Sequence, residues 1–296
     1  MQNRFIFFTE PRTNTFTTDL NQPLGKGVQG RVYKGVNNDT REIVAIKRIF
    51  AMDSVGIQKC MKEAQIMECL SQTYSINIIK YHGVARDQFT FSIAMEYASR
   101  SSLDVWLKDK TQSTMKDKQL FIMLGVASGL FYMHAEKILH CDIKPANIML
   151  GRDLQPKIGD FGLSKRIGVE DLSRIAGTPY YFSPELLLTG FCSPLYGGLH
   201  SEASDMYSFG LLCWCILTQS ASPNTKFKNP ADLLYGVVRD GYRETIPAEP
   251  HCPNKLSNLI QLSWWHDPQF RPKAIKAVEV IEEVIREESG ASHKLN

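Results

Sequence analysis

The feature that most constrains the fold is a glycine-rich segment at residues 24–32, with the pattern Gly-x-Gly-x-x-Gly at Gly25, Gly27 and Gly30. Glycines at this spacing let backbone N–H groups approach phosphate oxygens that a Cβ atom would keep away. On its own the pattern is equally that of a glycine-rich turn. In a dinucleotide-binding fold it must open a helix, whereas residues 31–36 are typical of a strand. The sequence therefore excludes that fold and predicts a flap between two strands that covers a nucleotide.

A lysine near the end of the next run of β-branched residues is a candidate partner for those phosphates. Because side chains alternate along a strand, Ala45 and Lys47 lie on one face. Ala45 is small enough to lie against a flat base, and Lys47 can reach toward phosphates. A lysine on a strand is usually solvated, but the following helix offers two carboxylates, Glu63 and Glu68. Glu63 fits better, because Met67 falls one turn later on its face and can pack inward.

Hydrophobic periodicity separates a strand-rich first part of the chain from a helical remainder. Up to about residue 100 the patterns predict strands at residues 31–36, 42–49, 79–85 and 89–96, with one helix at 56–70. Beyond a polar linker they predict helices at residues 118–136, 205–217, 230–239, 255–265 and 273–288. Glycines and prolines between residues 185 and 205 indicate an exposed loop.

These elements predict an α+β fold with two lobes. The first is a small antiparallel β-sheet lobe with one main helix, and the second is a larger, mostly α-helical lobe. We expect an N-terminal extension at residues 1–19, the small lobe at 20–97, the larger lobe at 98–285 and a polar tail that frays at 286–296.

Composition argues against several other classes of protein. The chain has 34 basic and 31 acidic residues, and the net charge of +3 does not indicate nucleic-acid binding. The longest apolar run, residues 209–217, is far shorter than the ~20 residues of a membrane span.

The cysteines indicate a reducing setting. There are seven, without the regular spacing of a disulfide framework. Cys213 and Cys215, on either side of Trp214, are expected to pack in a core rather than bind a metal ion. The apolar run near the N-terminus is too short for a signal peptide. We therefore expect a cytoplasmic location, with the nucleus as the alternative.

The most informative stretch is residues 138–150, where a polar loop lies between a long apolar helix and a short strand. Asp142 can accept a proton from a hydroxyl group, Lys144 can neutralise charge on a phosphoryl group in transfer, and Asn147 can ligate a metal ion through its amide oxygen. Further along, Asp160 offers a hard oxygen ligand suited to Mg²⁺. Either aspartate alone would most often be a surface acid, but five spaced elements in this order make coincidence negligible.

From about residue 20 to about residue 285, the chain resembles eukaryotic-type protein kinases. The resemblance rests on the glycine segment, the strand at 44–47, the loop at 138–150, Asp-Phe-Gly at 160–162 and Ser-Pro-Glu at 183–185. It implies an enzyme, a phosphotransferase that uses ATP and Mg²⁺ and moves the γ-phosphate to serine or threonine hydroxyl groups of protein substrates.

The resemblance also implies a role for individual residues. Asp142 would be the catalytic base and Lys144 would neutralise charge, while Lys47, paired with Glu63, would contact the ATP phosphates. The metal ligands would be Asn147 and Asp160. The residues that bind the nucleotide would be Gly25, Gly27, Gly30, Val32, Ala45, Lys47, Met95, Glu96, Ala98 and Met149.

Within that nucleotide set, the resemblance distinguishes residues that read the adenine edge from residues that enclose the base. Met95 would be the gatekeeper, and the carbonyl of Glu96 and the N–H of Ala98 would hydrogen-bond adenine. The base would lie between Val32, Ala45 and Met149.

Other matched positions have structural roles in the family. Glu185 would form a buried ion pair with Arg271. A column of stacked residues, anchored by Asp205, would consist of Met67, Tyr81, His140 and Phe161. Plain core packing is an equally valid description of Met67, Tyr81 and Met149.

The sequence departs from the family pattern in three places. Cys141 stands where many members have an arginine that binds a phosphate on the activation loop. We therefore hypothesise that activity does not require loop phosphorylation through that contact. Gln29 replaces a common aromatic lid, so the flap is expected to close less tightly. The loop at 186–204 is long, which favours a tolerated insertion over a docking role.

The substrate class follows from the same resemblance. Lys144, two positions after the proposed base, and the run at 177–181 are similar to serine/threonine kinases. Trp264-Trp265 and Cys141 are similar to the tyrosine-kinase-like or receptor-interacting branches. Ser102 and Ala146 occupy cleft positions that are acidic in kinases that prefer basic substrates, so we expect no strong selection for arginine.

Other functions remain as alternatives. A pseudokinase scaffold is disfavoured because all five polar residues of the nucleotide and metal sites are intact, and a small-molecule kinase is disfavoured by the peptide-docking run around Thr178. A dual-specificity kinase is a further alternative. We expect protein substrates as partners, with no nucleic acid, and the sequence leaves the oligomeric state open.

Overall fold

A computed structural model describes residues 16–27, 30–50, 53–73, 75–87, 89–109, 115–249 and 251–292. The described residues fall into two compact units. The first lies within residues 1–74 and 79–98, and the second comprises residues 75–78 and the chain from residue 99 onward. The α+β class and the division into a strand-rich and a helical part are confirmed.

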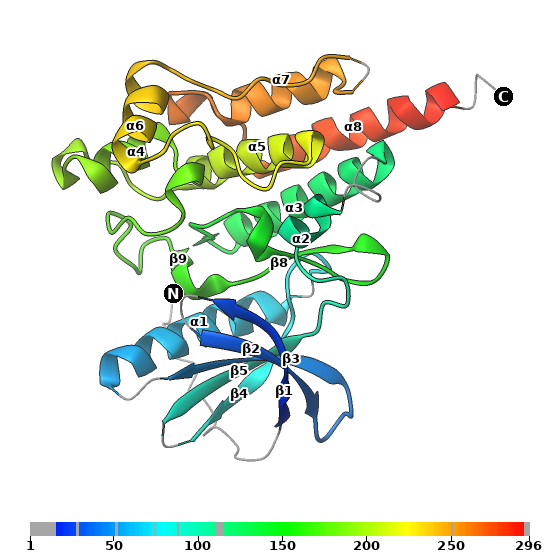
Figure 1. Cartoon of the computed structure of the whole chain (residues 1–296), viewed down its shortest axis with the longest axis vertical. Coiled ribbons are helices and arrows are strands. Elements are labelled where there is room, and N and C mark those ends of the chain that lie inside the picture. Colours follow the sequence, from blue (N-terminus) through cyan, green and yellow to red (C-terminus); the bar gives the residue numbers. More distant parts are fainter. Residues whose placement is uncertain are drawn as a thin grey trace. The chain divides into compact units, whose positions relative to one another are not determined.

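The first unit is a five-stranded antiparallel sheet with one helix (Figure 1). The strands follow the order β1-β2-β3-β5-β4. Their bounds are β1 Phe16–Gly27, β2 Gly30–Asn37, β3 Ile43–Phe50, β4 Tyr81–Arg86 and β5 Thr90–Glu96. The middle of β3 is buried, and Val44 and Ile46 form a core cluster with Ala94 of β5. Two β-branched residues of β3, Val44 and Ile46, therefore lie in the buried centre of this sheet.

The helix of the first unit, α1, spans Ser54–Gln72 and contains the predicted segment 56–70. Asp53 caps its first turn, since the Asp53 side chain accepts a hydrogen bond of 2.7 Å from the N–H of Gly56. Its buried face includes Cys60, Ala64 and Met67, which repeat at helical spacing. That periodicity fixes which side chains of α1 face the sheet.

The second unit is mostly helical (Figure 1). Its helices are α2 Leu103–Lys108, α3 Lys116–Ala135, α4 Pro184–Phe191, α5 Glu202–Thr218, α6 Pro230–Leu234, α7 Asn254–Ser263 and α8 Ala274–Ser292. Two pairs of short strands accompany them, β6 Ile138–Leu139 with β9 Lys165–Arg166, and β7 Ile148–Leu150 with β8 Pro156–Ile158. α3 packs against α5 and α8, and α7 packs against the same two helices.

Helix α5 is central to the second unit, as its apolar sequence predicts. Ser201 and Ser204 form a reciprocal capping box at its start. Its two cysteines, Cys213 and Cys215, are buried, and burial raises the pKa of the Cys215 thiol to about 12. These thiols are core residues, as expected.

The segment predicted as an exposed loop between residues 185 and 205 is largely ordered, and that prediction is wrong for most of it. Helix α4 occupies Pro184–Phe191, and one 3-10 turn follows at Pro194–Tyr196. Gly198 is not a loop glycine at the surface, since a Cβ there would lie 2.2 Å from the carbonyl oxygen of Glu185. The glycine marks a close approach of two backbone segments rather than an exposed turn.

Two other elements differ in extent from the prediction. The helix expected at 230–239 continues from α6 into a wider π-helical turn at Tyr235–Arg239. Gly236 in this turn lies against the ring of Phe227, and a Cβ there would come within 2.2 Å of that ring. α8 extends to Ser292, past the start of the predicted polar tail.

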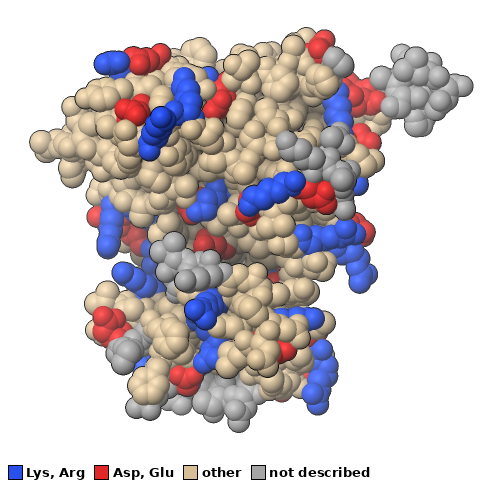
Figure 2. Space-filling view, in the orientation of Figure 1, with Lys and Arg blue, Asp and Glu red and all other residues tan. Residues whose placement is uncertain are grey.

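Basic and acidic side chains are interspersed over the face shown in Figure 2. Within the described part of the chain, no helix combines the length and the apolar character needed to cross a bilayer.

Candidate active site

The loop predicted to carry the chemistry lies in the second unit, between β6 and β7. It contains a single 3-10 turn, Pro145–Asn147. Asp142 is buried, with 8% of its surface exposed. Its Oδ2 accepts hydrogen bonds from Lys144 Nζ at 2.6 Å and from Asn147 Nδ2 at 2.9 Å. The three polar residues predicted for this loop therefore meet at one carboxylate.

The second oxygen of that carboxylate binds a later segment of the chain. Asp142 Oδ1 accepts hydrogen bonds from the N–H of Thr178 at 3.0 Å and from its hydroxyl at 2.8 Å. Lys144 Nζ donates to Thr178 Oγ1 at 2.6 Å. Sequence reasoning placed Thr178 in the substrate segment but missed this contact. The available signal was the preceding Gly177, whose φ of +137° favours glycine and brings the chain close to the Cys141 carbonyl.

Asp205 of α5 holds the backbone of the same loop. Its two carboxylate oxygens accept hydrogen bonds of 2.9 Å from the N–H groups of His140 and Cys141. His134 Nε2 lies 3.0 Å from Asp205 Oδ2. Burial alone would raise the pKa of Asp205, but the hydrogen bonds and charges of His134 and His140 hold it below its usual value. Asp205 is thus the anchor that the family resemblance implies.

Asp160 lies just beyond β8, in the left-handed region with φ 58° and ψ 76°. Asp160 is exposed, whereas Phe161 is buried and its ring packs edge-on against His140 at 5.8 Å between ring centroids. The N–H of Gly159 donates to the carbonyl of Asn147 at 2.9 Å. This bond ties the Asp160 segment to the loop that carries Asp142.

The donor set of these two segments fits Mg²⁺. The amide nitrogen of Asn147 donates to the carbonyl oxygen of Asp142 at 2.8 Å, so the amide oxygen is the atom that can ligate a cation. With the exposed carboxylate of Asp160 it provides two hard oxygen ligands. Magnesium in phosphoryl-transfer sites typically uses one or two such protein ligands together with substrate phosphates.

The first unit holds the predicted lysine and its partner. Lys47 Nζ lies 2.8 Å from Glu63 Oε1 and 3.1 Å from Oε2, and only 9% and 3% of the two side chains are exposed. Of the two candidate carboxylates, Glu63 is therefore the one that pairs with Lys47, as predicted. Nearby, burial and the Glu63 charge raise the pKa of the Cys60 thiol. Removing one partner of such a buried ion pair strongly destabilises the folded protein, because the other charge is left uncompensated.

The glycine segment joins β1 to β2, so it is followed by a strand, as expected, and not by a helix. Gly25 lies opposite Val32, and Gly27 opposite Gly30. A Cβ at Gly30 would lie 2.4 Å from the carbonyl oxygen of Arg48, so the close approach of β2 and β3 requires glycine there. Gln29, at the predicted tip of the flap, lies outside the described residues.

The residues expected around adenine belong to both units. In the first unit, Ala45 lies opposite Met95 across β3 and β5. Val32 lies opposite Lys47 across β2 and β3. Glu96 is the last residue of β5, and Ala98 is the last residue of the first unit. In the second unit, Met149 lies in β7 opposite Lys157.

The remaining family positions are structural. Arg271 forms a bidentate ion pair with Glu185, at 2.7 Å and 2.8 Å, and also donates to backbone carbonyls of Ala203 and His266. Of the predicted column, His140 and Phe161 are in contact in the second unit. Met67 and Tyr81 belong to the first unit, where burial and the charge of Glu68 raise the pKa of Tyr81 to about 12.

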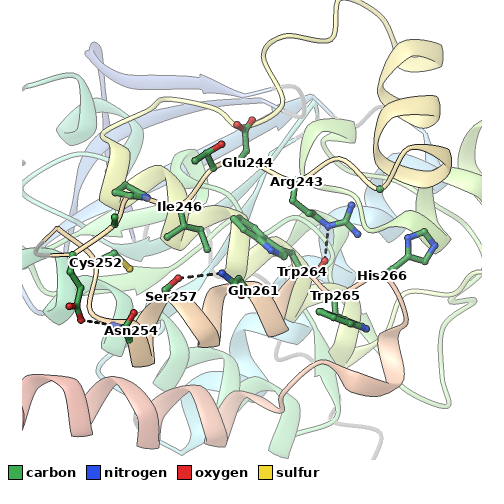
Figure 3. Close-up of a pocket in the computed structure, with 15 residues that line it drawn as sticks. Arg243, Glu244, Ile246, Cys252, Asn254, Ser257, Gln261, Trp264, Trp265 and His266 are labelled. Atoms are coloured by element: carbon green, nitrogen blue, oxygen red, sulfur yellow. Dashed lines mark hydrogen bonds between the residues drawn. The ribbon is translucent and has the colours of Figure 1, made fainter.

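A separate pocket of about 800 Å³ lies in the second unit, and sequence reasoning did not predict it (Figure 3). It lies between the extended segment after Gly241 and one side of α7, and ends near Trp264 and His266. Arg243 closes one part of it by donating to the carbonyl of Trp264 at 2.8 Å. None of the residues that line this pocket belongs to the loop that carries Asp142.

Comparison with known proteins gives one family for most of the chain. The family described as Protein kinase domain matches residues 18–281. The receptor-like serine/threonine-protein kinase SD1-7 of Arabidopsis thaliana is 35% identical over 83% of this chain and 29% of its own length. The mitogen-activated protein kinase kinase kinase A of Dictyostelium discoideum is 30% identical over 86% of the chain and 26% of its own length. The dual specificity protein kinase shkB of the same organism is 29% identical over 88% and 39%.

The chain thus spans less than half of the length of each of these relatives. The match nevertheless covers both units and every motif described above. The chain belongs to the protein kinase superfamily, of serine/threonine type.

Proposed function

We propose that the chain is an active protein kinase that transfers the γ-phosphate of ATP, with Mg²⁺, to serine or threonine hydroxyl groups of protein substrates. The observation that carries the proposal is the carboxylate of Asp142, whose orientation is fixed on both oxygens by Lys144, Asn147 and Thr178. Such a carboxylate can accept the proton of an incoming hydroxyl group.

The proposed reaction is an in-line displacement at the γ-phosphorus. The substrate hydroxyl loses its proton to Asp142, its oxygen forms a bond to phosphorus, and the bond to the ADP leaving oxygen breaks. Lys144, 2.6 Å from Asp142 Oδ2, is placed to neutralise charge that develops on the phosphoryl group. No covalent enzyme intermediate is required.

The remaining groups bind and neutralise the nucleotide. Lys47, held by Glu63, would contact the phosphates, and Asn147 and Asp160 would hold Mg²⁺. The metal ion, when bound, neutralises phosphate charge. The glycine segment excludes water by covering the phosphates.

The experiment is transfer of radiolabel from ATP to a mixture of candidate proteins, with Asp142→Asn as the matched variant. Label on serine and threonine that depends on Asp142 supports the proposal. Wild-type protein that binds ATP but transfers no label would instead establish a pseudokinase. Phosphoamino acid analysis tests the alternative of a dual-specificity kinase, the class that the shkB relative is named for.

The proposed substrate preference concerns the residues before the acceptor. Ser102 and Ala146 are not acidic, so no carboxylate at those positions is available to select arginine. A peptide library is expected to give no dominant arginine upstream of the phosphorylated residue. Strong enrichment of arginine there would contradict this part of the proposal.

We also propose that the chain works in a reducing compartment, the cytoplasm or the nucleus. The irregular spacing of its seven cysteines supports this location. Cell fractionation of the full-length protein, with the compartment markers as controls, tests it.

A further inference from the structure

The connection between α5 and α6 carries an asparagine whose contacts are not explained by the family motifs. Asn224 is buried, with 3% exposed, and its φ of 57° lies in the left-handed region that asparagine tolerates better than most residues. Its side-chain Nδ2 donates a hydrogen bond of 2.8 Å to the carbonyl oxygen of Tyr180. The two residues are 44 positions apart, so this bond joins two distant segments of the second unit.

The same connection holds Tyr180 a second time. The Tyr180 hydroxyl donates to the carbonyl oxygen of Phe227 at 3.3 Å. The N–H of Phe227 donates to the carbonyl of Asn224 at 3.1 Å, which closes a turn between them. One turn of the connection thus contacts both the backbone and the side chain of Tyr180.

Glu244 supports this turn from the other side. Its Oε1 accepts a hydrogen bond of 2.6 Å from the N–H of Asn224, and its Oε2 accepts one of 3.0 Å from the Tyr242 hydroxyl. The Tyr242 ring packs edge-on against Phe227 at 5.3 Å, with Lys226 Nζ 3.0 Å from its centroid. Glu244 also lines the pocket of Figure 3. Asn224 is therefore held by two hydrogen bonds, one from its side chain to Tyr180 and one from its N–H to Glu244.

Tyr180 lies only two residues after Thr178, which contacts the proposed base. The residues between them form a 3-10 turn, Pro179–Tyr181, in which the N–H of Tyr181 donates to the carbonyl of Thr178 at 2.9 Å. A shift of Tyr180 would therefore be passed along this short turn to Thr178 and to the surface beside Asp142. The acceptor hydroxyl of a protein substrate has to lie beside that carboxylate.

We propose that Asn224 is a positioning residue for protein substrates, which fixes the substrate-facing segment 178–182 through the Tyr180 carbonyl. The inference rests on the proposed kinase activity and adds to it a residue that controls binding of the protein substrate rather than of ATP.

The test compares Asn224→Gly with Gln219→Gly in the full-length chain. Glycine keeps the left-handed backbone and removes the side chain with its amide, and Gln219→Gly is a matched control because Gln219 has a similar φ of 52°, loses its side chain in the same way and lies in the same connection. The probe is a serine or threonine peptide selected from a library by the wild-type enzyme. Asn224→Gly is expected to raise KM for the peptide about fivefold to tenfold, the effect of one buried hydrogen bond, while KM for ATP changes less than about twofold. Gln219→Gly is expected to change neither constant.

A second measurement is independent of catalysis. Amide hydrogen exchange of residues 178–182 is expected to be faster in Asn224→Gly than in Gln219→Gly, with α5 unchanged in both. Asn224→Asp, whose carboxylate cannot donate to the Tyr180 carbonyl, is expected to reproduce both effects. An unchanged peptide KM in these variants, or an equal rise in KM for ATP, would overturn the inference. Wild-type protein that transfers no phosphate to any library peptide would instead contradict the proposed function.

Discussion

Thr178 is joined to Asp142 twice, through its N–H at 3.0 Å and its hydroxyl at 2.8 Å, both to the same carboxylate oxygen. The hydroxyl proton is donated to Asp142, so the oxygen of Thr178 can accept the bond from Lys144 Nζ at 2.6 Å. One threonine therefore fixes the relative orientation of the proposed base and of the proposed charge-neutralising lysine. The Thr178 hydroxyl group therefore has a structural role, because it bonds both Asp142 and Lys144.

Thr178→Val is expected to lower kcat about tenfold or more. Valine has nearly the same shape and keeps the backbone bond to Asp142, but it cannot donate to Oδ1 or accept from Lys144, and a lost hydrogen bond to charged groups is worth about 1.5–3 kcal/mol. Steady-state kinetics with a protein substrate measure the change. Thr178→Ser, which keeps the hydroxyl, is expected to retain most of the activity. If valine and serine variants behave alike, the hydroxyl is not used in this way.

Asp142→Asn is expected to lower kcat by about 10²–10⁴, the usual contribution of a general base. The asparagine carbonyl oxygen can still accept the N–H of Thr178, but its amide nitrogen cannot accept the bonds from Lys144 and Asn147, so a loss of stability is expected beside the loss of activity. Label transfer measures the loss, and thermal unfolding checks the fold. Activity within tenfold of the wild type would remove Asp142 from the role of base.

Ser173→Ala is expected to leave activity within about twofold of the wild type. Ser173 is an exposed hydroxyl of the segment after Asp160, whereas Ser164 is buried. Cys141 offers no guanidinium group to bind a phosphate. Lys165 Nζ already donates to the carbonyl oxygens of Asp171 and Arg174, at 2.7 Å and 2.6 Å, and orders this segment through its backbone.

Phosphatase treatment of the wild-type enzyme provides the second arm of that test. The treated protein is expected to remain active towards a protein substrate. A large loss on treatment, matched by the loss in Ser173→Ala, would show that loop phosphorylation is required after all.

Local patterns were sufficient for the features that depend on sequence neighbours. The choice of Glu63 over Glu68 rested on a single turn of helix, because Met67 fills the core position that follows Glu63 on α1. The structure agrees, with a 2.8 Å contact to Lys47. The strand pattern that follows Gly30, where a dinucleotide-binding fold needs a helix, was likewise enough to exclude that fold.

Contacts between distant segments could not be obtained in that way. Thr178 and Asp142 are 36 residues apart and Asn224 and Tyr180 are 44 apart, and no periodicity links such pairs. The error at α4 has a related cause. Its Gly190 and the later Gly198 resemble loop punctuation, but Gly198 is required by the close approach of Glu185, a tertiary contact that composition does not reveal.

Lys47→Met is expected to lower the free energy of unfolding by about 3–5 kcal/mol, because it removes the cation beside a buried carboxylate. Replacing both partners, Lys47→Met with Glu63→Leu, is expected to recover most of that loss, since neither charge then remains in the core. Denaturant unfolding measures all three proteins. A double variant no more stable than Lys47→Met would show that the ion pair is not the source of the effect.

The stability of the second unit is expected to fall in acid because of His200, which lies two residues before the start of α5. His200 is 1% exposed, and neither ring nitrogen has a hydrogen-bond partner among the described residues. Burial, aided by the positive charge of Lys165 on β9, lowers the pKa of His200 from 6.5 to about 4, while Asp205 of α5 and Asp142 of the catalytic loop oppose the shift. The folded protein therefore holds this imidazole neutral where an unfolded chain would protonate it.

The sign of the pH dependence follows from that lowered pKa. Stability from His200 is complete above about pH 6.5 and is lost as the pH falls towards 4, by up to ~3 kcal/mol. His200→Phe fills the same buried site without a titrating group, so its advantage in unfolding free energy over the wild type should grow between pH 7 and pH 4.5. Denaturant unfolding at several pH values measures the difference, with the exposed His251→Phe as control. A His200→Phe advantage that stays constant with pH would mean that this histidine does not titrate on unfolding.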